Sequence, residues 1–195
     1  MKALHVLGPA PLYTNTFLLL GENGHAVAVD PAASAEQYLD LLQKNKAELT
    51  DILLTHGHYD HVGAVEELKR RTGARIHLSK EDMGGSRLFP LTEADAGYED
   101  GETIAVDDMT FTVIRTPGHT AGSVCLLCGD LLFAGDTLFA GDIGRTDLEG
   151  SRPDLMRASL RKLCGAVTSD AQVLPGHDRF STMDAEKAEN PYLRF

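Results

Sequence analysis

Hydrophobic and polar positions follow two rhythms along this chain. Short runs dominated by apolar residues, several of them bounded by Gly, Pro, Asn or Asp, predict β-strands. These runs are residues 4–7, 16–20, 25–29, 51–54, 75–78, 110–115, 123–127, 131–134 and 172–174. The second and third runs are joined by Gly21-Glu22-Asn23-Gly24, a sequence that favours a hairpin turn.

Stretches with helical spacing lie between several of these runs. One begins at Ser34, which forms a capping-box pattern with Gln37. The others cover residues 62–71 and 154–163. Because strands and helices alternate in one chain, the pattern predicts a layered α/β fold.

The length of 195 residues suits one domain with a sizeable core. We find no linker, low-complexity tract or charge block, and therefore expect a single domain over residues 1–195. Residues 79–100 contain Gly84-Gly85 and Pro90 and show no clear periodicity, so we expect a surface insertion there.

The composition is that of a soluble globular protein, with 43% hydrophobic and 24% charged residues. No apolar run approaches the about 20 residues that a membrane span requires, and the first residues look like a strand rather than a signal peptide. We therefore expect a cytoplasmic protein. The net charge of −11, from 18 basic and 29 acidic residues, opposes binding to nucleic acid or to an anionic membrane surface. A nuclease is thereby disfavoured without being excluded.

Three cysteines do not describe a disulfide framework. Cys125 and Cys128 form a Cys-x-x-Cys pair, which is compatible with redox activity or with half of a zinc site. They lie, however, within an apolar run that predicts a strand, and no second pair accompanies them. We therefore interpret both as buried free thiols.

The strongest chemical signal is a cluster of metal-binding residue types, His56-Gly57-His58-Tyr59-Asp60-His61. It lies where a predicted strand ends and a predicted helix begins. In an extended segment, residues two apart point the same way, so His56, His58 and Asp60 can share one face. Four potential ligands within six positions predict a metal site, and their spacing suits two adjacent ions better than one.

Three later segments repeat this arrangement of a short apolar strand followed by a tight turn. Pro117-Gly118-His119, Gly135-Asp136 and Pro175-Gly176-His177 each place a potential ligand directly after such a strand. Gly and Pro allow the chain to leave a strand abruptly and to approach a ligand closely. Each turn alone is weak evidence, but together with the first cluster they form a set.

This set, His56-x-His58-x-Asp60-His61 followed by His119, Asp136 and His177, resembles the metallo-β-lactamase superfamily. The resemblance extends from Asn15-Thr16-Phe17 and Val29-Asp30-Pro31 to Asn190-Pro191-Tyr192-Leu193. It implies an αββα sandwich, in which two sheets pack face to face between helices. It also implies that His56, His58 and His119 hold one metal, that Asp60, His61 and His177 hold the other, and that Asp136 bridges them. We expect Asp60 and His61 to take part in catalysis as members of the second set.

The chemistry of such a site favours hydrolysis. Metal ions lower the pKa of bound water to about 7, which makes a bridging hydroxide available at neutral pH. Two divalent ions outweigh the charge of two carboxylates and one hydroxide, so the pocket can attract an anionic substrate. Zinc is the expected metal, although imidazole and carboxylate ligands also suit iron, manganese and nickel.

Two branches of the superfamily remain open. The segment Ile143-Gly144-Arg145-Thr146-Asp147 and the ending Asn190-Pro191-Tyr192-Leu193 resemble short single-domain hydrolases similar to glyoxalase II, which cleave thioesters such as S-lactoylglutathione. The persulfide dioxygenases also carry a Gly-Arg-Thr-Asp segment and use one iron, held by residues matching His56, His119 and Asp136. Asp178 stands where the short hydrolases more often have glycine and is nearer the dioxygenase pattern.

The resemblance does not identify substrate-binding residues, because the C-terminal helical domain of full-length glyoxalase II is not expected here. Tyr59, Arg145 and Arg179 lie near expected ligands, and the arginines suit a substrate carboxylate. A structural ion pair is an equal alternative for Arg145 and the favoured one for Arg179. The expected partner is a small anionic thioester. A ribonuclease or lactonase of the same superfamily, and a metal-binding protein without activity, are less favoured.

Overall fold

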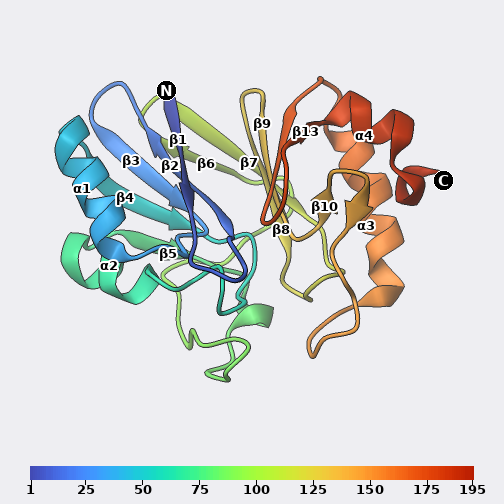
Figure 1. Ribbon diagram of the computed structural model, residues 1–195, viewed down its shortest axis with the longest axis horizontal. Coiled ribbons are helices and arrows are strands. Elements are labelled where there is room, and N and C mark those ends of the chain that lie inside the picture. The colour runs from blue at the N-terminus through green and yellow to red at the C-terminus, as the bar shows by residue number, and fades with distance from the viewer.

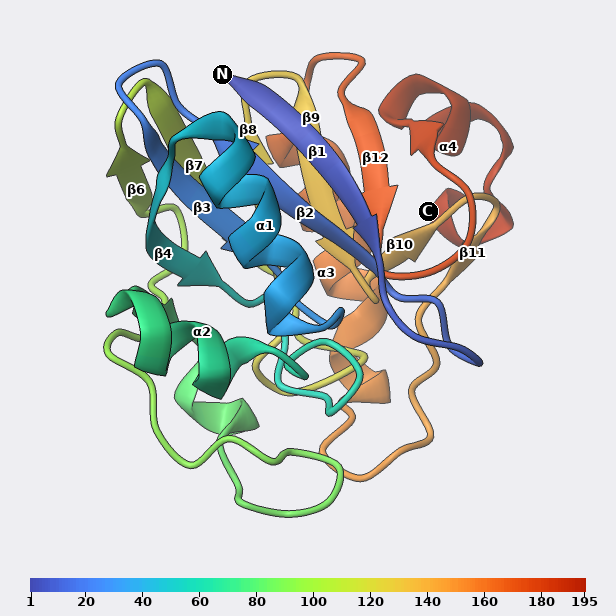
Figure 2. The ribbon, with the colours of Figure 1, turned by 60° about the vertical axis from the view of Figure 1, so that its left-hand side comes forward.

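The computed structural model describes residues 1–195 and contains two β-sheets packed between helices (Figure 1). The first sheet has the strand order β1-β2-β3-β4-β5, and the second has the order β13-β12-β9-β8-β7-β6. Helices α1 and α2 cover the outer face of the first sheet, while α3 and α4 lie beside the second (Figures 1 and 2). This arrangement confirms the expected αββα fold.

The first sheet comes from the amino-terminal part of the chain. Strands β1, β2 and β3 pair antiparallel, and β3, β4 and β5 pair parallel. Its elements are β1 (Lys2–Leu7), β2 (Asn15–Leu20), β3 (His25–Val29), α1 (Ala35–Asn45), β4 (Glu48–Leu53), α2 (Val65–Thr72) and β5 (Arg75–His77), followed by the short helix η1 (Lys80–Asp82).

The second sheet is formed by the rest of the chain. Strands β6 to β9 pair antiparallel in succession, β12 lies parallel to β9, and β13 closes the edge. Its strands are β6 (Thr103–Val106), β7 (Met109–Arg115), β8 (Val124–Cys128), β9 (Leu131–Gly135), β12 (Gln172–Pro175) and β13 (Ser181–Thr182). The remaining elements are the hairpin β10 (Leu138–Phe139) and β11 (Asp142–Ile143), then α3 (Pro153–Ala166), α4 (Met183–Glu189) and η2 (Pro191–Leu193).

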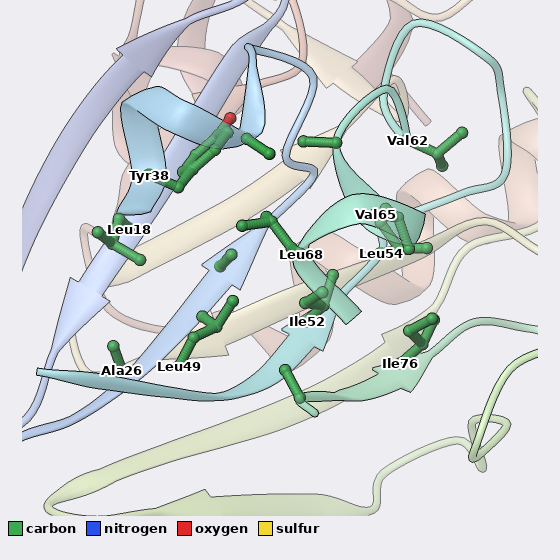
Figure 3. Packing of buried hydrophobic residues seen from close by; sticks show 14 of the residues in the cluster. Leu18, Ala26, Tyr38, Leu49, Ile52, Leu54, Val62, Val65, Leu68 and Ile76 are labelled. Carbon is green, nitrogen blue, oxygen red and sulfur yellow. The ribbon is translucent and has the colours of Figure 1, made fainter. Parts of the chain in front are cut away.

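Alternation along the strands separates the core into layers. On β2, Leu18 and Leu20 point toward the helices, while Phe17 and Leu19 point toward the second sheet. This follows from the two-residue period of a strand, because both faces of the sheet are covered. The helix-side layer, with Leu18, Ile52 and Leu68, appears in Figure 3. A third layer lies between the second sheet and α3.

Most sequence-predicted elements are confirmed, with corrections at their ends. The second helix begins at Val65 rather than at residue 62, because Val62 still belongs to the loop that precedes it. The capping-box prediction at Ser34 is wrong: its side chain makes no capping hydrogen bond, and its carbonyl oxygen accepts from the Gln37 amide at 3.0 Å. The pattern also missed β6, the two-residue strands and α4.

The interpretation of the cysteines is confirmed. Cys125 and Cys128 are free and buried within β8, and burial raises the pKa of the Cys125 thiol to about 11. The expectation for residues 79–100 is only partly correct. The segment is irregular, but it buries Asp82, Phe89 and Tyr98, so it is not a peripheral insertion. No helix combines the length and the apolar character needed to cross a membrane.

Candidate metal centre

All seven expected ligands lie at the ends of strands from the two sheets. Residues 55–61 follow β4 in the first sheet, while His119, Asp136 and His177 follow β7, β9 and β12 in the second. The ligands therefore come together only because the two sheets pack face to face.

Three histidines form the first ligand group. One nitrogen from each of His56, His58 and His119 lies within 4.8 Å of the others, and His58 Nδ1 is 2.9 Å from His119 Nε2. His119 Nδ1 lies 2.8 Å from the carbonyl oxygen of Arg145, which can only accept a hydrogen bond. The proton of neutral His119 therefore belongs on Nδ1, which leaves Nε2 free to bind a metal.

The second ligand group contains Asp60, His61 and His177, whose ligand atoms also lie within 4.8 Å of one another. His177 Nε2 is 3.3 Å from Asp60 Oδ2, while His177 Nδ1 donates to the carbonyl oxygen of Leu12 at 3.1 Å. His61 Nδ1 donates to Asp30 Oδ2 at 3.0 Å. In both histidines, the nitrogen facing the other ligands is thus free of the proton in the neutral form.

Asp136 lies between the two groups. Its Oδ1 is 3.5 Å from His61 Nε2, and its Oδ2 is 3.4 Å from His119 Nε2 and 3.6 Å from His177 Nε2. The carboxylate thus faces histidines of both groups, in the position that the family resemblance implies for a bridging ligand.

The residues fit a pair of divalent metal ions. The buried atoms His56 Nε2, His61 Nε2 and Asp136 Oδ1 have no hydrogen-bond partner. Buried polar atoms are normally satisfied, so unsatisfied atoms gathered among other ligand atoms require an explanation. A cation accounts for all of them, because imidazole nitrogen and carboxylate oxygen are both metal donors.

Burial and charge set different ionisation states for the ligands of the two groups. Burial opposes protonation of His61, but Asp136 and Asp30 beside it hold its pKa above the ordinary value, so a metal must displace a proton there. For two histidines of the first group and for Asp136, the pKa is shifted the other way. Burial and the neighbouring His119 lower the pKa of His58 to about 4, and burial likewise lowers that of His56. Burial opposes ionisation of Asp136, but the histidines around it, first of all His61, hold its pKa well below the ordinary value. His56 and His58 are therefore neutral and Asp136 is charged at pH 7, the states that bind metal.

A cavity of about 410 Å³ opens on the centre. Its walls include apolar side chains, among them Leu12, Leu88 and Phe139, and it is also lined by Tyr59 and Arg145. The Arg145 guanidinium makes two hydrogen bonds to Asp147, at 2.7 and 2.8 Å, which is the structural ion pair considered from the sequence. Arg179 is exposed and is not among the residues lining the cavity.

Asp30 has a role at the centre that the sequence reasoning missed. Its carboxylate is buried and accepts hydrogen bonds from the Thr55 amide at 2.7 Å, the Thr55 hydroxyl at 2.6 Å and His61 Nδ1. The available signal was its place in Val29-Asp30-Pro31, directly after a strand, which is also where the ligands are found. Asp82, a second buried carboxylate near the ligands, was also missed, because no pattern distinguishes it within residues 79–100.

Close packing around the ligands explains two small residues. A Cβ on Gly176 would collide with Asp136 Oδ1 and the His61 ring, and one on Gly144 would collide with the Asp136 carbonyl oxygen. Asp178 has φ +65°, in the left-handed region that glycine adopts most freely. Glycine is therefore the easier residue there, and aspartate is among the residues that tolerate this conformation.

Comparison with known proteins agrees with the fold. The sequence profile of the metallo-β-lactamase superfamily matches residues 9–188, and this chain belongs to that superfamily. It is 31% identical to the hydroxyacylglutathione hydrolase GloC of Haemophilus influenzae, over 92% of each chain.

Two solved structures resemble this chain along most of its length. ETHE1 from Myxococcus xanthus aligns with a TM-score of 0.85 and 29% identity, covering 98% of this chain and 84% of that one. TTHA1623, solved in a di-iron-bound form, aligns with a TM-score of 0.83 and 31% identity, covering 97% of this chain and 100% of that one. The chain is therefore a superfamily member with a cluster of histidines that suits a metal, and its relatives include both a hydroxyacylglutathione hydrolase and ETHE1.

Proposed function

We propose that this protein is a metal-dependent thioester hydrolase of the glyoxalase II type, which uses two divalent ions, most simply zinc. The observation that carries the proposal is the complete second ligand group of Asp60, His61 and His177 beside the first. A mononuclear iron enzyme requires only the set matching His56, His119 and Asp136. The similarity to the hydroxyacylglutathione hydrolase of Haemophilus influenzae supports the same choice.

The metal ions supply an activated water and polarise the carbonyl group of the substrate. The protein's own contribution is to hold the ligands in the neutral or ionised states described above and to shape the cavity. A thiol leaving group has a pKa of about 8.5 and departs readily as the thiolate, so a separate general acid is not required. This agrees with a cavity whose carboxylates and imidazoles belong mainly to the ligand groups.

The expected substrate is a small anionic thioester, with S-lactoylglutathione as the first probe. Arg145 is the positively charged side chain that lines the cavity, so it is the proposed contact for a substrate carboxylate, and Tyr59 forms part of the same wall. The proposal includes no nucleic-acid or membrane partner, since the chain carries a net charge of −11. A cytoplasmic location is part of the proposal.

A persulfide dioxygenase is the second candidate, and Asp178 is the observation that favours it. This residue follows His177, as in the dioxygenase pattern, although it occupies a backbone conformation suited to glycine. Such an enzyme would hold one iron through two histidines and one carboxylate.

Elemental analysis of freshly purified protein, with zinc and iron measured together, separates the two candidates. Two metals per chain and hydrolysis of S-lactoylglutathione are expected. A His177→Ala variant should lose the second metal and most of its turnover, because His177 completes the second group, whereas His25→Ala outside the site should behave as the wild type. One iron per chain, with oxygen uptake on glutathione persulfide and normal activity of His177→Ala, would overturn the proposal.

A further inference from the structure

Asp82 is a buried carboxylate that belongs to neither ligand group. It ends helix η1 and is 1% exposed. Its Oδ2 accepts hydrogen bonds from the Gly57 amide at 3.0 Å and the Thr120 hydroxyl at 2.7 Å, and its Oδ1 accepts one from the Gly122 amide at 2.8 Å. Every partner is a donor, so an ionised carboxylate satisfies all three at once.

The three donors lie on the two loops that carry the whole first ligand group. Gly57 stands between His56 and His58, and Thr120 directly follows His119. One loop leaves the first sheet and the other leaves the second. A backbone hydrogen bond from the Val124 amide to the Thr55 carbonyl oxygen, 2.8 Å long, joins the two loops at their ends. Asp82 joins them at the ligands themselves.

Two glycines, Gly57 and Gly122, leave room for the Asp82 side chain between the loops. A Cβ on Gly122 would collide with the Asp82 carboxylate, and a Cβ on Gly57 would collide with the Asp82 backbone. The absence of both side chains is what allows the carboxylate to reach the two amides. Thr120 is fixed in turn by Ser123, whose hydroxyl lies 2.8 Å from the Thr120 hydroxyl and accepts from the Thr120 amide at 3.1 Å.

We propose that Asp82 is a positioning residue, which holds the two loops so that His56, His58 and His119 are in binding geometry before a metal arrives. This inference rests on the metal centre of the proposed function and not on the reaction. Ligands that are already oriented lose little conformational freedom when the metal binds, so their affinity is higher than that of mobile ligands. Without Asp82, the two loops could separate at the ligands, while the second group would keep its own contact through Asp30.

Asp82→Asn changes the shape of the side chain little. It tests the role because donors face both carboxylate oxygens, so the amide N–H groups of asparagine must point at one or more of them. Thr120→Val removes a single donor and serves if the first variant folds poorly. Glu81→Gln is the matched control, since Glu81 is the neighbouring residue and its carboxylate binds Arg115 at 3.0 Å rather than either loop. Zinc affinity is measured by competition with a chromophoric chelator, starting from metal-free protein.

Asp82→Asn should weaken one zinc site by about 10- to 100-fold, the usual effect of losing an outer hydrogen-bond partner of a metal site. Thr120→Val should weaken the same site by about two- to tenfold, since one hydrogen bond is lost. The other site, and both sites of Glu81→Gln, should keep the wild-type affinity. In metal-free wild-type protein, hydrogen exchange should show protected Gly57 and Gly122 amides, and Asp82→Asn should release them.

Wild-type affinity at both sites in Asp82→Asn and Thr120→Val would overturn the proposal. So would an equal loss at both sites together with a lower melting temperature, because that pattern marks a purely structural role. The proposed function is tested separately: protein that binds two zinc ions without hydrolysing thioesters would refute it, while the affinity comparison would still decide the role of Asp82.

Discussion

Replacing Asp30 by asparagine tests how the second ligand group is oriented. The Thr55 amide can only donate, so the oxygen of the new side chain must remain opposite it, and the amide nitrogen then faces the Thr55 hydroxyl and His61 Nδ1. The hydroxyl can turn and accept. His61 must instead give up its Nδ1 proton and carry one on Nε2, the nitrogen that lies 3.5 Å from Asp136.

The expected size of the effect follows from the hydrogen bond that is lost. A hydrogen bond to a charged group contributes about 1.5–3 kcal/mol, which corresponds to about 10- to 100-fold in metal affinity. Metal-free protein should lose a similar free energy of unfolding. Backbone strain adds little to this value, because Asp30 has φ +47° and asparagine tolerates that region as well as aspartate does.

Zinc competition on metal-free protein measures the affinity, and nitrogen NMR of the imidazoles reports which nitrogen of His61 carries the proton. Asp51→Asn is the control, since Asp51 is a second buried aspartate, bonded to His77 at 2.8 Å and outside both ligand groups. It should lower stability without changing zinc affinity. Two zinc ions bound at wild-type affinity in Asp30→Asn, with the proton still on His61 Nδ1, would refute the reasoning.

Four further results are expected. Removing the metals with a chelator should abolish thioester hydrolysis and lower the melting temperature, and added zinc should restore both, because ions that bind only the folded state stabilise it. Phe133→Ala should lower the free energy of unfolding by about 3–5 kcal/mol in urea titrations, since this ring is 1% exposed between the two sheets. Burial opposes ionisation of Asp51, but the hydrogen bond from His77 lowers its pKa. Ionised Asp51 therefore stabilises the fold above the ordinary aspartate pKa, and this contribution is lost as the pH falls through the lowered value. The free energies of unfolding of the wild type and Asp51→Asn should converge at acidic pH, and a constant difference between them would contradict this. Arg145→Gln should raise KM for S-lactoylglutathione by about 1.5- to 5-fold, the range of an exposed ion pair, whereas Arg179→Gln should leave KM unchanged.

The ligand set could be predicted from the sequence because its signal is local. Each ligand lies in the segment that follows a short apolar strand, and the ends of strands that run in one direction meet at one edge of a sheet. The turns that carry His119 and His177 are weak evidence one by one, but together with His56 and its neighbours they form a set that resembles a known superfamily. The layered fold followed from the same runs, with the hydrophobic pattern strong enough to locate most strands within a few residues.

The supporting residues could not be predicted in the same way. The sequence does not distinguish an aspartate that accepts three buried hydrogen bonds, such as Asp82, from an aspartate in solvent. Only the tertiary contacts show the difference. The same is true of Arg145 and Arg179, which both stand near ligands in sequence but differ in their access to the cavity. Strands of two residues, such as β13, have too few positions for any periodicity to appear.

Each ligand group draws on both sheets: the first needs His119 and the second needs His177, in addition to residues that follow β4. Neither half of the chain can therefore assemble a complete site while the other half is unfolded. A metal bound by either group would therefore link the two halves of the chain, and metal binding would report whether the two halves are packed together. A complete ligand group exists only after the two sheets have packed against each other.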